Sequence, residues 1–492
     1  MDRRSFLIGT AALGVVGAEA APAADEVKAG LDRAIRFYRD KVAAHGGYVW
    51  RSSGDLALHE GEGKAGPDTI WVQPPGTPTV GEAFLDAYDA TGKKDYLEAA
   101  RAAGQALVQG QLHSGGWYYR IEFTPEKRKE FSYRVAPGKG APQFGDEPGS
   151  PGGWVLWKQR RNPGNMTMLD DDTTQAALRF LIRLDRTVQP ADSRLHECVE
   201  YGLAALTKVQ YPVGAFTHNY DRLTTRNPDP AYYSVKNASY PEQWSRTWTK
   251  DFQGCYMLND EISLDTMNTL FQAHDAYGKP EYRDAALRVG EFLLRAQMPD
   301  PQPAWAQEYD RNMQPVWDRK FEPPAISGYE SQSVLESLLS LYERTGDRKY
   351  LQPVPKALAY LRSSLLSDGK LARFYELKTN KPLYFNLKYE LTYDRAQMPK
   401  HYGFVIPSRL EAITQRYERL LKSGPKSRER EPSRTELEAE ARRVISTLDS
   451  RGAWVEMGGL DSHEVKPASG IISSATFVKN VSLLARYLRA KG

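Results

Sequence analysis

Cysteine is scarce in this chain of 492 residues, which contains only Cys198 and Cys255. Two cysteines exclude a disulfide framework and allow at most one bridge, and two buried free thiols are at least as good an interpretation. An excess of one charge is also missing, because 66 basic residues stand against 62 acidic ones and three of the basic residues lie near the start of the chain. A nearly neutral mature protein gives no indication of a nucleic-acid partner.

Several catalytic motifs are absent as well. The sequence has no H-E-x-x-H zinc motif, no Walker loop and no G-x-S-x-G elbow, and its eight histidines are scattered. Interpretations as a zinc hydrolase or a serine hydrolase are therefore weak. The run GEGKAG (61–66) satisfies G-x-G-x-x-G, but no predicted strand precedes it and no helix begins there, so it does not indicate a nucleotide site.

Long hydrophobic runs are lacking beyond the first residues, which excludes a transmembrane helix there and predicts no membrane partner. The opening MDRRSFLIGTAALGVVGAEAAPAA (1–24) places Arg3 and Arg4 before a short apolar stretch and small residues suited to cleavage. This pattern predicts a twin-arginine export signal, removed near residues 20–24. We expect residues 25–492 to form a single domain that acts as a monomer in the periplasm or after secretion.

A helical hairpin pattern recurs along the chain. Each copy has an apolar helix, a turn with glycine and a basic residue, a tyrosine and a second helix, so that TGKKDY in one copy matches YGKPEY in another. Three clear copies and a diverged one, at 173–216, are present; the clear ones lie at 82–117, 262–305 and 330–361. Such hairpins cannot bury their inner faces alone, so they must pack against one another.

The hairpins predict an all-α fold, an (α/α) toroid whose long loops form a cleft. An opening helix (26–44) and a closing helix (473–490) would complete it. An open solenoid is the competing architecture, but long proline-rich interruptions argue against it, and long loops are where sites tend to lie. The highly charged stretch 422–443 is expected to be a solvated linker or an exposed helix. The 28 tyrosines and ten tryptophans suit either helix packing or an acidic carbohydrate ligand.

Three consecutive acids, Asp170, Asp171 and Asp172, stand directly before the apolar run AALRFLIRL. Helix capping is a sufficient explanation for one aspartate, because acids are favoured at helix N-termini. Three in a row repel each other unless water screens them or a cation neutralises them. The triplet alone favours the cap.

A second acidic site, YMLND (256–260), holds the same place before the third hairpin. Equivalent helix starts share one rim of a toroid, so the carboxylates can converge. A hard cation such as Ca²⁺ binds several oxygen ligands, and Asp170, Asp171 and Asp260 are the candidates to supply them. Independent capping at each helix remains the alternative.

Basic residues near the next hairpin have two explanations each. In VWDRKFEPPAISGYES (316–331), Arg319 and Lys320 adjoin Glu322, which suits a structural salt bridge as well as a catalytic arginine. The segment LARFYELKTNKPLY (371–384) alternates basic and aromatic residues, which indicates either a surface strand or the wall of a cleft for a polyanion.

Taken in order, these stretches resemble the family-10 polysaccharide lyases, the pectate lyases of (α/α) toroid type. The resemblance lies in LDDDTTQAALRFL, KVQYPVGAF, LND before a helix, WAQEYDRNMQPVWDRKFEPPAISGYES, LARFYELKTNKPLY and GAWVE followed by FVKNVSLLARYL. It covers roughly residues 165–390 and 450–490.

The resemblance implies roles for individual residues. It places the family's essential aspartate and its neighbour on Asp170 and Asp171, and the second calcium-site aspartate on Asp260. The catalytic arginine falls on Arg319, with Lys320 beside it as a substrate contact, and a further substrate contact falls on Arg373. After KPLY the chain departs from the family pattern, and Lys388 is the candidate to replace an arginine there as a point charge.

The implied reaction is calcium-assisted β-elimination of 4-linked polygalacturonate, an acidic polysaccharide partner. A base removes the C5 proton, O4 leaves, and a 4,5-unsaturated end forms. Arginine as the base is implied by the resemblance alone, since its pKa normally exceeds about 12. Two alternatives stay open: a metal-free glycoside hydrolase with Asp172 and Asp260 as acid and base, and an exported glycan-binding protein without activity.

Overall fold

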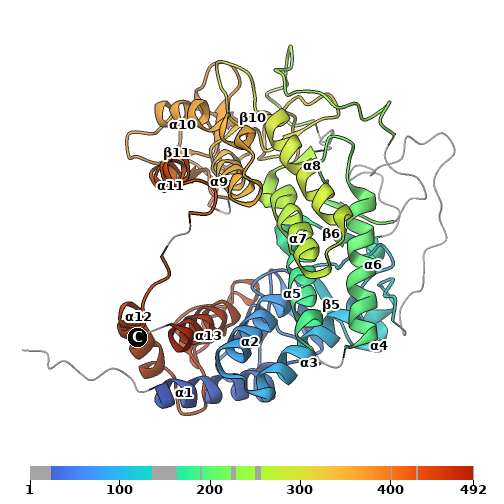
Figure 1. Ribbon diagram of the computed structural model, residues 1–492, viewed down its shortest axis with the longest axis vertical. Coiled ribbons are helices and arrows are strands. Elements are labelled where there is room, and N and C mark those ends of the chain that lie inside the picture. Colours follow the sequence, from blue (N-terminus) through green and yellow to red (C-terminus); the bar gives the residue numbers. More distant parts are fainter. Residues whose placement is uncertain are drawn as a thin grey trace, which may run out of the picture.

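Helical hairpins arranged around a ring make up most of the molecule (Figure 1). The computed structural model describes residues 24–135, 163–188, 191–222, 229–249, 256–400, 402–427 and 430–490. The predicted all-α toroid is confirmed. The predicted leader lies outside the described residues, except for Ala24, and so does Cys255.

All four predicted hairpins are present. They are α2 (Thr77–Thr91) with α3 (Lys94–Gly110), α5 (Thr173–Thr187) with α6 (Ser193–Val209), α7 (Ile262–Tyr277) with α8 (Pro280–Ala296), and α9 (Gly328–Thr345) with α10 (Val354–Ser363). Four helices flank them: α1 (Ala24–Phe37), α11 (Leu410–Ser423), α12 (Arg434–Ser446) and α13 (Ser474–Arg489). Along the inside of the ring, α13 contacts α2, α2 contacts α5, and α5 contacts α7. The inner helices from α13 to α7 thus pack on one another, and the fourth hairpin packs through α9 on α8, so the hairpins bury their apolar faces against one another.

The glycines of the repeated turns end the first helix of three hairpins. Gly92, Gly278 and Gly346 have φ of 70°, 69° and 72°, and each N–H donates to the carbonyl of the residue four positions earlier. A side chain at this left-handed position would be strained, which explains the glycine in TGKKDY and in its repeats.

Three tryptophans mark the ends of outer helices. Trp117, Trp305 and Trp454 are buried, and each indole N–H donates over 2.8 Å to a backbone carbonyl ten or twelve residues earlier, on Leu107, Leu293 and Val444. The tryptophan that closes the repeats at 82–117 and 262–305 therefore fixes a helix end in the core, and Trp454 does the same after α12.

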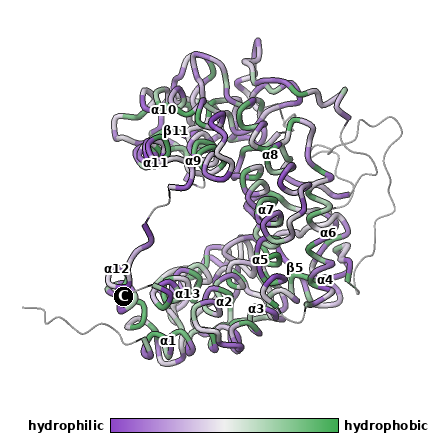
Figure 2. The backbone as a smooth tube through the Cα atoms, viewed as in Figure 1, coloured by the Kyte–Doolittle hydropathy of each residue, from purple (hydrophilic) through white to green (hydrophobic). Residues whose placement is uncertain are grey.

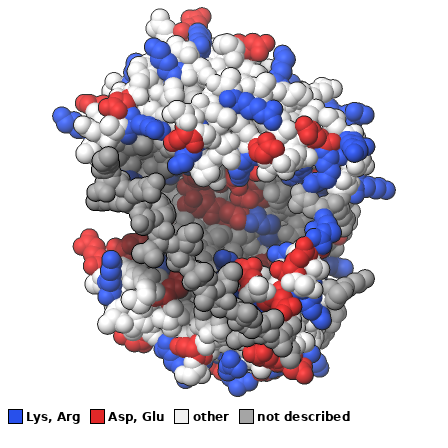
Figure 3. All heavy atoms as spheres, turned by 90° about the vertical axis from the view of Figure 1, so that its left-hand side faces the viewer, with Lys and Arg blue, Asp and Glu red and all other residues white. Residues whose placement is uncertain are grey.

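The ring is open between α11 and α12, where the connecting chain crosses (Figure 1). Figure 2 shows this crossing as mainly hydrophilic, and Figure 3 shows a hollow on this side with acidic side chains at its floor. A groove of about 1070 Å³ lies there between α7, α9 and α11. Its charged residues form ion pairs with each other, such as Arg344 with Asp275 and Arg416 with Glu343. This groove contains none of the predicted site residues.

Short β-sheets connect the hairpins. The five-stranded sheet has the order β16 (Val455–Glu456), β17 (Ile471–Ser473), β1 (Arg51–Ser53), β2 (His59–Glu60) and β3 (Lys64–Ala65). The four-stranded sheet has the order β10 (Ala325–Ser327), β12 (Phe374–Glu376), β13 (Pro382–Phe385) and β14 (Leu391–Thr392). Two-stranded sheets pair β4 (Thr69–Trp71) with β5 (Arg120–Glu122) and β11 (Leu371–Ala372) with β15 (Val405–Ile406). Most of residues 371–384 therefore lie in strands, and these strands are buried rather than at the surface.

Two further antiparallel pairs position the candidate site. β6 (Thr167–Met168) pairs with β7 (Asn219–Tyr220) before α5, and β8 (Tyr256–Met257) pairs with β9 (Glu308–Tyr309) before α7. The two pairs occupy equivalent positions in consecutive hairpin repeats, so the chain segments that follow them lie in equivalent places.

Candidate active site

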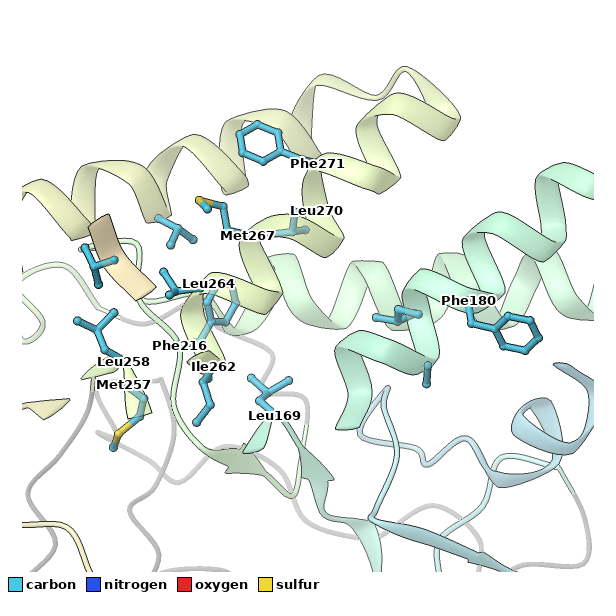
Figure 4. Close-up of a cluster of buried hydrophobic side chains, with 14 of the residues drawn as sticks. Leu169, Phe180, Phe216, Met257, Leu258, Ile262, Leu264, Met267, Leu270 and Phe271 are labelled. Carbon is cyan, nitrogen blue, oxygen red and sulfur yellow. The ribbon is translucent and has the colours of Figure 1, made fainter. Parts of the chain in front are cut away.

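Two turns of the same construction lead into α5 and α7. They are η4 (Asp170–Asp172) and η5 (Asn259–Glu261), each preceded by a buried leucine, Leu169 or Leu258. Figure 4 shows both leucines near Ile262 among buried apolar side chains. In each turn, the N–H of the leucine and the next N–H donate to one carbonyl of the opposite chain segment, that of His218 or Gln307.

The same two positions of each turn adopt left-handed backbone conformations. The φ values are 50° at Asp171, 57° at Asp172, 45° at Asp260 and 60° at Glu261. Residues other than glycine rarely adopt this conformation, although aspartate tolerates it better than most. Neither turn provides a side-chain hydrogen bond that caps the following helix. The capping interpretation of the acidic triplet is therefore wrong.

The turns bring three carboxylates together instead. Ligand oxygens of Asp170, Asp171 and Asp260 all lie within 4.8 Å of one another. Asp172 does not join them, because it forms an ion pair with Arg179 of α5. Asp170 and Asp171 are thus the members of the triplet that converge with Asp260.

Neighbouring side chains hold these carboxylates in place. The hydroxyl of Tyr119 donates to Asp170 over 3.2 Å, and the amide of Gln73 donates to Asp171 over 2.8 Å. The other oxygen of Asp170, Oδ1, is buried and accepts no hydrogen bond from any described residue. An oxygen that is buried without a donor is available to a cation.

The pKa values of Asp170, Asp171 and Asp260 indicate whether a cation fits between their carboxyl groups. Burial, followed by the charge of Asp170, raises the pKa of Asp171 to about 6 and that of Asp260 to about 8. Burial also acts to raise the pKa of Asp170, but His218 and Arg319 lower it to about 2. Three carboxyl groups with oxygen donors only, two of which resist ionisation beside each other, fit a hard divalent cation such as Ca²⁺.

Stability should therefore respond to calcium in a way that depends on pH. In the metal-free protein, Asp171 and Asp260 have raised pKa values, so the folded state holds protons that the unfolded state releases. The contribution of these two groups to the free energy of unfolding therefore falls as pH rises from about 4 to about 8. A cation removes that repulsion. We expect calcium at 100 times its Kd at pH 8 to stabilise the fold by about 3 kcal/mol at that pH. The same calcium concentration should stabilise it by much less at pH 5.5, where protonated carboxyl groups bind the ion more weakly.

Differential scanning calorimetry with calcium and with chelator at both pH values measures this difference. An equal calcium-induced shift in Tm at pH 5.5 and pH 8 would show that these carboxylates do not bind the ion.

Arg319 lies against the carboxylate cluster. Its Nε and Nη2 each donate to Glu322 over 2.6 Å, and Nη2 also donates to Asn259 and Asp260 over 3.0 Å. Burial acts to lower the pKa of Arg319, but Glu322 and the other carboxylates raise it well above its usual value. Nη1 donates to none of the described residues, and 31% of the side chain is exposed. Nη1 is therefore the part of the guanidinium available to a ligand.

Arg373 connects to Arg319 through Tyr402 and Glu322. The hydroxyl of Tyr402 accepts from Arg373 over 3.2 Å and donates to Glu322 over 2.9 Å. The guanidinium is stacked between Tyr329 and Tyr402, with ring centroids at 4.7 and 4.5 Å, and 11% of the side chain is exposed. Because both faces of the Arg373 guanidinium are covered by tyrosine rings, only its exposed edge can contact a substrate.

The two predicted lysines lie on the surface. Lys320 follows Arg319, and its Nζ is 3.6 Å from the ring centroid of Tyr389. Lys388 is the residue before Tyr389, in the exposed turn between β13 and β14. Lys320 therefore lies beside the turn that carries Lys388.

Gln73, Tyr119, His218 and Tyr402 are among the residues of the site that were not predicted from the sequence. A signal for His218 is present in the hairpin repeat. AFTHNY (215–220) aligns with AWAQEY (304–309), which places His218 and Gln307 at the same point of their repeats. In the structure these two residues provide the carbonyls that hold the twin turns.

Comparison with known proteins gives a family-model match in the central part of the chain. Residues 155–368 match the family model described as pectic acid lyase. No curated protein matches the sequence.

Solved structures that resemble the fold include three carbohydrate-active enzymes. A mutant of a family 10 polysaccharide lyase from Cellvibrio cellulosa, in complex with trigalaturonic acid, is 16% identical, with a TM-score of 0.43, over 70% of this chain and 98% of the other. A D-mannose isomerase is 14% identical, with a TM-score of 0.47, over 96% and 100% of the two chains. A cellobiose 2-epimerase from Bacillus thermoamylovorans is 14% identical, with a TM-score of 0.44, over 95% and 98%.

Proposed function

We propose that this polysaccharide lyase, whose residues 155–368 match the pectic acid lyase family, cleaves 4-linked polygalacturonate by β-elimination with Ca²⁺ as its cofactor. The observation that supports this most directly is the shared contact at Asp260. Its carboxylate belongs to the cluster of oxygen ligands and also accepts a hydrogen bond from Arg319 over 3.0 Å. The groups that would hold a cation and the group that would act on the substrate are therefore adjacent.

Asp170, Asp171 and Asp260 are the proposed calcium ligands. Calcium bound there would take the uronate carboxylate as a further ligand and stabilise the negative charge that develops on it when the C5 proton leaves. Tyr119 and Gln73 fix two of the three carboxylates before a substrate arrives. Preorganised charges of this kind require no rearrangement during the reaction.

Arg319 is the proposed base, with Nη1 directed to the C5 proton. A protonated guanidinium cannot accept a proton, and the carboxylates around it raise its pKa in the metal-free protein. Glu322 lies 2.6 Å from Nε and Nη2, so it is placed to take a proton from the guanidinium. Neutralising the nearby carboxylates favours that transfer, because they no longer stabilise the cation.

The remaining positive groups are proposed to bind the polymer. Lys320 and Lys388, beside Tyr389, would attract uronate carboxylates outside the cleaved bond, where an exposed point charge suffices. Arg373 would contact substrate through the exposed edge of its guanidinium while holding Tyr402 against Glu322.

The proposed location is outside the cytoplasm, and the proposed active form is the monomer. The twin-arginine pattern at residues 1–24 supports export. Within the described part of the chain, no helix has the length and apolar character that crossing a membrane requires.

The test of the proposed function is near-ultraviolet absorbance during incubation of the mature protein with polygalacturonate. We expect the absorbance of 4,5-unsaturated products to increase with time when calcium is present. A calcium chelator should lower the rate of this increase at least about 100-fold, since one electrostatic element of catalysis is commonly worth 10²–10³ in rate. Adding calcium back in excess of the chelator should restore the rate.

Two other outcomes would reject parts of this proposal. New reducing ends without absorbance would indicate hydrolysis, for which Asp172 and Asp260 were the candidate pair. The ion pair of Asp172 with Arg179 already holds that carboxylate apart from the cluster that Asp260 joins. No product of either kind would mean that polygalacturonate is not the substrate.

A further inference from the structure

A second group of possible metal ligands lies beside the proposed calcium site. It consists of His218, Glu308 and Asp318, whose ligand atoms all lie within 4.8 Å of one another. His218 directly precedes β7, Glu308 begins β9, and Asp318 directly precedes Arg319. The three residues are 4%, 2% and 3% exposed, so the fold encloses them almost completely. They cannot contact a polymeric substrate directly.

Glu308 has no hydrogen-bond partner for its carboxylate. Both oxygens are buried, and none of the described residues donates to either of them. Its near neighbours include Asp318 and Glu322, which are acids, and burial followed by the charge of these acids raises the pKa of Glu308 well above its usual value. A carboxylate buried beside other carboxylates is strongly disfavoured unless a proton or a cation joins it.

The balance of charge around Glu308 is negative. Six carboxyl groups lie in the two clusters and beside Arg319, those of Asp170, Asp171, Asp260, Glu308, Asp318 and Glu322. Arg319 pairs with Asp260 and Glu322, and His218 pairs with Asp170 and Asp318. One Ca²⁺ at the first three carboxylates leaves the deeper group still short of positive charge. The deficit lies at Glu308 and Asp318.

The orientation of His218 fits a metal ligand as well as it fits a protonated imidazole hydrogen-bonded to Asp318. Nε2 contacts Oδ2 of Asp318, and Nδ1 faces Oδ1 of Asp170 at a distance of 3.6 Å without a hydrogen-bond partner. A metal-bound histidine usually directs its second nitrogen to a carboxylate, which fixes the ring and its tautomer. In this arrangement Nε2 is the ligand atom and Asp170 is the carboxylate that orients the ring.

We propose that His218, Glu308 and Asp318 bind a second divalent metal ion of the first transition row, with Zn²⁺ the best match. One imidazole nitrogen with two carboxylate oxygens is a ligand set that suits zinc, whereas calcium binds oxygen ligands. The ion fixes the positions of two residues of the proposed active site. His218 connects it to Asp170, and Asp318 directly precedes Arg319 in the chain. This inference does not depend on the identity of the polysaccharide or on calcium.

The first experiment measures metal content. The full mature protein is purified without chelators, exchanged into a calcium-free buffer by gel filtration, and analysed by inductively coupled plasma mass spectrometry. We expect about one equivalent of zinc per chain to remain. Stripping the ion and titrating with Co²⁺ should then produce visible d–d absorption, which reports nitrogen and oxygen ligation directly and requires no catalytic turnover.

Variants assign the ion to the site. Glu308→Gln keeps the size of the side chain and should lose at least about 90% of the bound zinc and of the cobalt absorption. Asp318→Asn should behave in the same way. Asp171→Asn is the matched control, because Asp171 belongs to the calcium cluster, and this variant should keep the full equivalent.

Three outcomes would overturn the proposal. One is wild-type protein that contains no transition metal and gives no cobalt absorption, in which case Glu308 is a neutral acid beside a protonated His218. Another is folded Glu308→Gln and Asp318→Asn protein with full zinc content, which would place the ion elsewhere. The third is loss of zinc from Asp171→Asn, which would make it an ion of the first cluster. Lyase activity can be present or absent in any of these cases.

Discussion

Arg319→Ala should lower kcat on polygalacturonate by on the order of 10³-fold, because the variant loses both the proposed base and a positive charge beside the reacting carboxylate. The guanidinium is held by three acceptors, Glu322, Asn259 and Asp260, which fix the direction of Nη1. Arg319→Lys should restore less than about a tenth of the lost rate, since a lysine cannot reproduce this fork of donors. The measurement is the initial rate of absorbance increase at saturating calcium and substrate.

Lys320→Ala is the matched control for Arg319→Ala. It removes the adjacent cation, which lies on the surface over Tyr389, so we expect KM to rise a few-fold while kcat stays nearly constant. The comparison requires folded protein, because Arg319→Ala leaves the buried Glu322 without its main partner. Gln307 and Tyr402 still donate to that carboxylate over 3.0 and 2.9 Å. An Arg319→Ala variant that is folded and keeps more than a tenth of the wild-type kcat would remove Arg319 from the chemistry.

Asp171→Asn should weaken calcium binding by at least about 100-fold, equivalent to about 3 kcal/mol. One of three charged ligands becomes neutral, and calcium affinity in proteins depends strongly on the number of charged ligands. Isothermal titration calorimetry at pH 8 measures the Kd directly. At this pH Asp171, with a pKa of about 6, is ionised in the wild type.

Asp172→Asn is the control, since it makes the same change one residue later. This carboxylate forms an ion pair with Arg179 and lies outside the cluster, so the calcium Kd should change less than about threefold. The cost should appear in stability instead, at about 1–3 kcal/mol, because a partly buried arginine loses its partner. If Asp172→Asn were the variant that lost calcium, the register assigned to the triplet would be off by one residue.

The sequence predicted the hairpins because their information is local. Apolar residues at helical spacing and a glycine in the left-handed position recur in each copy, and Gly92, Gly278 and Gly346 adopt the φ that this pattern requires. The convergence of Asp170, Asp171 and Asp260 also followed from local information, since equivalent helix starts share one rim.

The backbone of the twin turns could not be predicted in the same way. An aspartate before an apolar helix usually caps it, so local propensity favours the wrong conformation for Asp171 and Asp172. Their left-handed conformation depends on contacts with a distant segment, in particular the carbonyl of His218. The enclosure of Arg373 between Tyr329 and Tyr402 likewise depends on residues far apart in the sequence.

The left-handed residues of the twin turns also have a consequence for ion selectivity. A non-glycine residue in this conformation costs roughly 1–2 kcal/mol, and the surrounding fold imposes it on four such residues before any ion arrives. Oxygen ligands held by so constrained a backbone cannot contract around a smaller ion. Mg²⁺ requires near-ideal octahedral geometry at about 2.0–2.1 Å, whereas Ca²⁺ accepts longer and less regular contacts. We therefore expect the proposed calcium site to discriminate against magnesium through its size, without any change in ligand type.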